Sequence, residues 1–172
     1  FSNDRISDLK VKIMKKINNI FLKKKILIYG LGKSGISTYN FLSRKDEINL
    51  FDDKIINNFK FNKKILSFSK ILKSNFDFII ISPGIDFSKC RLSKYLKQNY
   101  SKIYTDLDVF YSFFNNDSVT ITGTNGVSTA AKRLYEVLRS QKKDGRVVGN
   151  IGNTIVSKKK ITKKTFFVIE AS

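Results

Sequence analysis

Residues 25–35 read KILIYGLGKSG, and the fold class can be inferred outward from this stretch. Its first half, Lys25–Tyr29, is a short apolar run typical of a strand that is buried on both faces of a parallel sheet. Its second half, Gly30–Gly35, is glycine-rich and leads into a helical pattern that extends from about Ser34 to Arg44. This order predicts a βα unit whose tight turn can bring an anionic group close to the helix N-terminus.

Acidic residues follow this turn at a distance typical of nucleotide sites. Asp52 and Asp53 come about 20 positions after Gly32, at the end of a second expected strand over 48–51, where a carboxylate can grip a ribose or a base edge. Three interpretations remain open for the turn: a dinucleotide site for NAD(P), a site for another nucleotide-like ligand, and a purely structural turn.

Further strands and helices alternate along the chain. A third strand, 76–81, ends at Ser82-Pro83-Gly84, which is either a simple strand-ending turn or a loop that lines a ligand. The alternation predicts parallel sheets with ligands at the carboxyl ends of the strands. The remaining elements expected before a linker at 115–117 are a short strand at 65–68, a helical turn at 69–72, a helix at 92–98, a strand at 102–104 and a helix at 107–114.

A second glycine-rich turn follows an expected strand at 118–122. It reads TGTNGVST over 122–129 and has the spacing and the hydroxyl of a phosphate-binding P-loop. A P-loop also needs a lysine that reaches the β- and γ-phosphates, and this chain has Val127 at that position. The turn is therefore either a nucleotide site without its cation or a loop that only resembles one.

The segment after the second turn continues the α/β pattern. A helix is expected over 128–141 with Leu134, Val137 and Leu138 facing inward, followed by strands at 146–149 and 166–169. Asn150 follows the first of these strands, as a turn residue or a ligand contact. Glu170 ends the second, as a magnesium ligand or an exposed acid. The fold class is thus α/β, with a Rossmann-like parallel-sheet N-terminal domain followed by the start of a P-loop-type α/β domain.

Composition limits the function classes. The chain has 172 residues and a formal net charge of +19, but its basic residues are 27 Lys and 6 Arg spread along the whole length, which favours composition bias over a nucleic-acid surface. The absence of His excludes a Ser-His-Asp triad and His-ligated metals within this chain. One cysteine, Cys90, excludes an intrachain disulfide and fits a cytoplasmic location, and no apolar run is long enough for a transmembrane helix.

Taken together, the motifs resemble the Mur ligase family. GTNG-x-ST with GNIG and a distal E-A-S is the most specific part, and GLGKSG with SPGI favours the member that adds D-glutamate. The resemblance covers 25–172 in family order. It is carried by YGLGKSG (29–35), LFDD (50–53), ISPGI (81–85), TDLDVF (105–110), TITGTNGVST (120–129), GNIGN (149–153) and VIEAS (168–172).

The resemblance implies an ATP-dependent, ADP-forming ligase of cytoplasmic peptidoglycan-precursor synthesis. Its substrates would be UDP-N-acetylmuramoyl-L-alanine, D-glutamate and ATP with Mg²⁺, and a monomer with no nucleic-acid or membrane partner is expected. The implied UDP-sugar contacts are Gly32, Lys33, Ser34, Asp52, Asp53, Gly84 and Asn150. The implied ATP contacts are Gly123, Thr124, Asn125, Gly126, Val127, Ser128 and Thr129, with Ser128 and Glu170 on the metal.

Two departures from the family qualify this expectation. Family members carry Lys where this chain has Val127, so no catalytic residue can be assigned there and the chain by itself is expected to be inactive. The chain also stops at Ser172 inside an expected core strand, which suggests a C-terminally truncated fragment. The expected organisation is an N-terminal extension with an amphipathic helix (1–24), a UDP-sugar domain (25–114) and a partial ATP domain (115–172). A non-catalytic nucleotide-binding module and an NAD(P)-dependent oxidoreductase domain are the alternatives.

Overall fold

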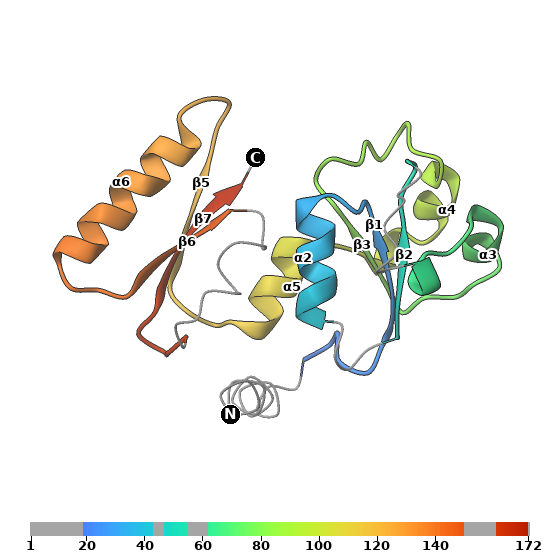
Figure 1. The fold of residues 1–172 in the computed structure, drawn as a ribbon, viewed down its shortest axis with the longest axis horizontal. Helices are drawn as coiled ribbons and strands as arrows, with labels where there is room; N and C mark the ends of the chain where they lie inside the picture. Colours follow the sequence, from blue (N-terminus) through green and yellow to red (C-terminus); the bar gives the residue numbers. More distant parts are fainter. Residues whose placement is uncertain (1–18, 43–46, 55–61, 150–160, 172) are drawn as a thin grey trace.

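The computed structural model describes residues 19–42, 47–54, 62–149 and 161–171. Its strands form two parallel sheets (Figure 1), which confirms the predicted α/β class. The expected N-terminal helix and Asn150 lie outside the described residues. The helices are α2 (Lys33–Leu42), α3 (Phe68–Leu72), α4 (Ser93–Gln98), α5 (Asp106–Phe113) and α6 (Val127–Ser140), with short 3-10 turns η1 (Asn62–Lys64) and η2 (Tyr100–Lys102).

The first sheet has four strands in the order β2-β1-β3-β4, all parallel. Helices α2 and α5 cover one face, where Ile26, Ile28 and Leu50 meet Leu42 and Phe113. Helices α3 and α4 cover the other face. This double cover explains the continuous apolar runs of the central strands, since both faces are buried. The strands are β1 (Lys25–Tyr29), β2 (Glu47–Phe51), β3 (Phe78–Ile81) and β4 (Ile103–Thr105).

The second sheet has three parallel strands in the order β5-β7-β6. Helix α6 packs on one face through Ala131 and Leu138, against Val168 of the central strand. The opposite face carries Phe167 and Ile169, which pack against Phe110 of α5. Figure 1 shows α5 between the two sheets with α6 on the far side of the second. The strands are β5 (Ser118–Thr122), β6 (Gly145–Gly149) and β7 (Phe166–Ala171).

Two local predictions are wrong. The strand expected at 65–68 is reduced to a single bridge between Leu50 and Ile65, because Ser67 caps a helix that begins at Phe68, with the Lys70 N–H donating to the Ser67 hydroxyl at 3.4 Å. Val137, expected to face inward, is 54% exposed. The inward side of α6 consists of Ala131, Leu134 and Leu138, whose spacing follows one helix face and leaves Val137 beside it.

Candidate functional site

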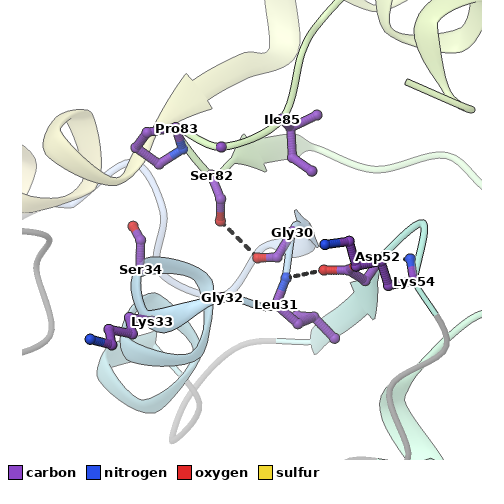
Figure 2. Close-up of a pocket in the computed structure, with 11 residues that line it drawn as sticks. Gly30, Leu31, Gly32, Lys33, Ser34, Asp52, Lys54, Ser82, Pro83 and Ile85 are labelled. Carbon is purple, nitrogen blue, oxygen red and sulfur yellow. Dashed lines mark hydrogen bonds between the residues drawn. The ribbon is translucent and has the colours of Figure 1, made fainter. Parts of the chain in front are cut away.

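A cavity of about 540 Å³ opens at the carboxyl ends of β1, β2 and β3 (Figure 2). The chain runs from β1 to β2 on one side and returns to β3 on the other, so the cavity lies where the strand order reverses. Open α/β sheets bind ligands at such a switch point. The cavity is lined by Gly30, Leu31, Gly32, Lys33, Ser34, Asp52, Lys54, Ser82, Pro83, Gly84 and Ile85.

The first turn is tight because two glycines allow backbone to approach backbone. Gly30 has φ +94°, and a Cβ there would lie 2.8 Å from the Cβ of Ser82. A Cβ at Gly35 would overlap the carbonyl oxygen of Gly30. The Ser82 hydroxyl donates to that same carbonyl at 2.7 Å (Figure 2), so the turn after β3 is fastened to the turn after β1. The predicted GLGKSG and SPG motifs therefore form one wall.

Asp52 lines the cavity, and its carboxylate already accepts hydrogen bonds from backbone N–H groups. One oxygen accepts from the Leu31 N–H at 2.6 Å (Figure 2) and the other accepts from the Lys54 N–H at 2.8 Å. These bonds join the first turn to the loop after β2. Asp52 therefore shapes the cavity rim as well as facing it, and each oxygen keeps a further lone pair for a donor on a ligand.

Asp53 is not among the residues that line the cavity. One of its carboxylate oxygens accepts from the Tyr29 hydroxyl at 2.7 Å and from the Arg91 N–H at 3.3 Å. The other oxygen is buried without a hydrogen-bond partner among the described residues. Burial first, and then the bond to Asp53, raises the pKa of Tyr29 well above its usual value. The predicted ligand contact of Asp53 stays untested, and the contact that the structure shows is with the end of β1.

Replacing Tyr29 by Phe tests the hydrogen bond between Tyr29 and Asp53. At neutral pH the variant should lose about 1–2 kcal/mol of unfolding free energy, because the Asp53 carboxylate loses a buried donor. Because the folded-state pKa of Tyr29 is raised, the folded protein keeps a proton that the unfolded chain releases above about pH 10. The tyrosine's contribution is therefore present below pH 10 and falls above it, by at most ~1.4 kcal/mol per pH unit. Urea denaturation at pH 7 to 11 should show the gap between wild type and variant shrinking above pH 10, and a constant gap would contradict the prediction.

Two lysines give the cavity a cationic character. Lys33 and Lys54 are exposed and line it, and Lys33 is the first residue of α2. The first N–H groups of a helix have no intrahelical acceptor, and the helix dipole also favours an anion there. The only acidic side chain among the lining residues is Asp52, whose oxygens accept from backbone donors. The cavity thus suits an anionic ligand with groups that donate hydrogen bonds.

The second turn connects β5 to α6 and is exposed. Gly126 has φ +75° and precedes the helix without any side-chain cap, which leaves first-turn N–H groups available for an anion. Ser128 is the second residue of α6, and Glu170 pairs in register with Ile121 near the ends of β7 and β5. A hydroxyl and a carboxylate of the kind that hold magnesium-bound phosphates are therefore present at one sheet edge. Val127 folds back over the turn, with its Cγ2 3.6 Å from where a Gly123 Cβ would lie.

The uncapped helix start, the Ser128 hydroxyl and the Glu170 carboxylate are the kinds of group that hold a magnesium nucleotide. The position where a P-loop has its lysine is occupied by Val127. The described residues contain no group of three or more His, Cys, Asp or Glu side chains that could form a metal site without a ligand's own oxygens. Among the described helices, none is long and apolar enough to cross a membrane.

Two residues at or beside the first site, Lys54 and Asp106, are not among the site residues predicted from the sequence. Lys54 lines the cavity directly after the LFDD motif, so its position beside that motif was the available signal. Asp106 is 4% exposed and accepts a hydrogen bond from the Ser34 hydroxyl. The motif TDLDVF indicates no role for Asp106 by itself, because a contact across 72 residues cannot be read from local spacing.

Sequence relatives place the chain in a family. It is 32% identical over 160 residues to the UDP-N-acetylmuramoylalanine--D-glutamate ligase of Rickettsia felis, covering 90% of this chain and 35% of that protein. It is 35% identical over 162 residues to the enzyme of the same name from Buchnera aphidicola, covering 88% and 36%. The chain belongs to the Mur ligase family. As a Mur ligase chain it spans about a third of the length of these curated relatives.

No protein-family model matches this Mur ligase chain. The crystal structure of UDP-N-acetylmuramate-alanine ligase MurC from Thermotoga maritima is similar with a TM-score of 0.48 and 14% identity, covering 86% of this chain and 37% of that one.

Proposed function

We propose that this chain is part of an ATP-dependent ligase that adds D-glutamate to UDP-N-acetylmuramoyl-L-alanine in the cytoplasm. The observation that carries the proposal is the cavity at the switch point of the first sheet, with Lys33 and Lys54 on its wall and the first turn of α2 open to it. A UDP-sugar offers what this cavity suits: a diphosphate for the cations and a uracil and sugar with donor groups. The named relatives are ligases of that substrate class.

The proposed division follows the two sheets. Residues 25–114 form the UDP-sugar domain, 115–172 form part of the ATP domain, and 1–24 precede both. In the first domain, Gly32, Lys33, Ser34, Asp52 and Gly84 contact the UDP-sugar, since all five line the cavity. We retain Asp53 and Asn150 as proposed contacts on the family resemblance alone. The protein is proposed to act as a monomer without nucleic-acid or membrane partners.

The proposed reaction has two balanced steps. The substrate carboxylate attacks the γ-phosphorus of ATP, and the bond from that phosphorus to the bridging oxygen breaks, giving an acyl phosphate and ADP. The amine of D-glutamate then attacks the acyl carbon, loses a proton and displaces inorganic phosphate, giving the amide. The chain's contribution is positioning and charge stabilisation. The turn at 123–129 would hold the ATP phosphates through backbone N–H groups, with Ser128 and Glu170 on the magnesium.

Val127 favours a second candidate for this chain, a nucleotide-binding module without ligase activity. A valine offers no charge to the transferred phosphoryl group, and loss of a charge contact of that kind costs ~2–5 kcal/mol. Lys132 is no substitute, because five residues turn it about 140° around the helix. We therefore expect no amide formation from ATP, UDP-N-acetylmuramoyl-L-alanine and D-glutamate by this chain alone. Detectable product would reject the non-catalytic candidate.

Calorimetric titration tests the proposed ligand of the first cavity. The chain is titrated with UDP-N-acetylmuramoyl-L-alanine, with NADH and with Mg-ATP under the same buffer and salt. Binding of the UDP-sugar without binding of NADH is the expected result. Binding of NADH instead would identify GLGKSG as a dinucleotide site and overturn the ligase proposal.

A further inference from the structure

Helix α5 contacts both sheets of the molecule. Val109 and Phe113 lie in the core between α2 and the first sheet, where the ring of Phe113 meets that of Phe41 edge-on at 4.8 Å. Phe110 points the other way and meets Phe167 of β7 edge-on at 4.9 Å. One short helix therefore sets the spacing between the sheet that carries the first glycine turn and the sheet that carries the second (Figure 1).

The N-terminal end of α5 bonds directly to the first glycine turn. The Ser34 hydroxyl donates to one carboxylate oxygen of Asp106, and the other oxygen accepts from the Leu107 N–H at 3.0 Å. Both side chains belong to buried residues, with Ser34 7% and Asp106 4% exposed. Ser34 lines the cavity and Asp106 does not. Asp106 therefore contacts a cavity-lining residue without lining the cavity itself.

This contact is well placed to define the wall. A buried carboxylate keeps its hydrogen bonds, because an unsatisfied buried oxygen costs free energy. Each oxygen of Asp106 accepts from one donor. A serine hydroxyl has a single proton, so donation to Asp106 fixes the rotamer of Ser34 and leaves only lone pairs for the cavity. Ser34 is the second residue of α2, and the next residue, Gly35, sits against the carbonyl of Gly30. A shift of Ser34 would therefore move the first turn of α2 against the strand end.

We infer that Asp106 is a positioning residue: acting through Ser34, it sets the first turn of α2, and α5 thereby holds the nucleotide-sugar cavity in a fixed relation to the sheet of the second turn. The identity of the ligand in this inference rests on the proposed function. Asp106 does not touch the ligand, and its effect passes through one hydrogen bond.

The test compares Asp106→Ala with Asp106→Asn. Both variants remove the same charge, and asparagine can still accept from Leu107 and donate to Ser34, so their difference reports these two hydrogen bonds together. The Ser34→Ala background then separates the bond to Ser34. Affinity for UDP-N-acetylmuramoyl-L-alanine should be about three- to tenfold lower in the alanine variant than in the asparagine variant. In a Ser34→Ala background the affinities of the two Asp106 variants should differ by less than about twofold, since the Ser34 hydroxyl that bonds residue 106 is absent. Thermal unfolding of each variant is measured first, so that affinities are compared only between folded proteins.

A second readout needs no ligand. Amide hydrogen exchange of residues 36–38 should be faster in the alanine variant than in the asparagine variant by a similar factor. Equal affinities and equal exchange in the two variants would overturn the inference, as would a difference that persists without the Ser34 hydroxyl. If the wild-type chain does not bind the UDP-sugar, the proposed function fails, and the exchange rates alone then decide whether Asp106 positions the turn.

Discussion

Gly35→Ala should abolish stable folding of the first sheet and its helices. The added methyl would overlap the Gly30 carbonyl oxygen and come within 2.9 Å of the Ser82 hydroxyl oxygen. Neither neighbour can move cheaply, because Gly30 directly follows β1 and the Ser82 hydroxyl is hydrogen-bonded to that same carbonyl. We expect a loss of about 4 kcal/mol or more, which is exceptional for one methyl and comparable to the whole stability of many domains.

Gly32→Ala is the matched control, three residues earlier in the same turn. A Cβ there meets nothing within 4 Å, so the unfolding free energy should change by no more than about 1 kcal/mol. Because Gly32 lines the cavity, the same methyl should weaken ligand binding while the fold persists. The chain has no Trp, so urea denaturation is followed by far-ultraviolet circular dichroism. Similar denaturation midpoints for the two variants would show that the turn is looser than the structure indicates.

The fold class could be predicted because each element carries its own signal. Runs such as KILIY are apolar without alternation, which only a strand buried on both faces requires, and glycines mark the turns that follow. The structure confirms the strands at 25–29 and 118–122 with these bounds. Helix α5 begins at Asp106, one residue before the predicted start. A capping box explains this, with Asp108 accepting from the Thr105 N–H at 2.7 Å, and the Thr-x-x-Asp spacing was visible in the sequence.

The site was predictable in part, for a different physical reason. Residues that follow parallel strands meet at one sheet edge, so Gly32, Asp52 and Gly84 were expected together, and all three line the cavity. Which of the two neighbouring aspartates faces the cavity was not predictable. Asp52 and Asp53 are neighbours in sequence, yet one lines the cavity and the other bonds Tyr29, because successive side chains at a strand end point to opposite sides. Asp106 required knowledge of how α5 packs on α2.

Val127→Lys should create affinity for Mg-ATP at the second turn. The valine already lies over the turn beside Gly123, so the stem of a lysine can follow the same path and carry its ammonium to the phosphates. A hydrogen bond to a charged group contributes about 1.5–3 kcal/mol, which corresponds to roughly a 10- to 150-fold gain in affinity. The gain should fall with added salt, because the turn is exposed and its charges are screened.

Val127→Met provides the control for this gain, since it lengthens the side chain without adding charge. Calorimetric titration with Mg-ATP should show the gain in the lysine variant and not in the methionine variant. Both variants should bind the UDP-sugar as the wild type does, because the first cavity lies on the other sheet. Equal ATP affinity in the two variants would mean that the backbone, Ser128 and Glu170 do not form a phosphate site. The valine would then mark a turn that has kept the shape of a P-loop without its ligand.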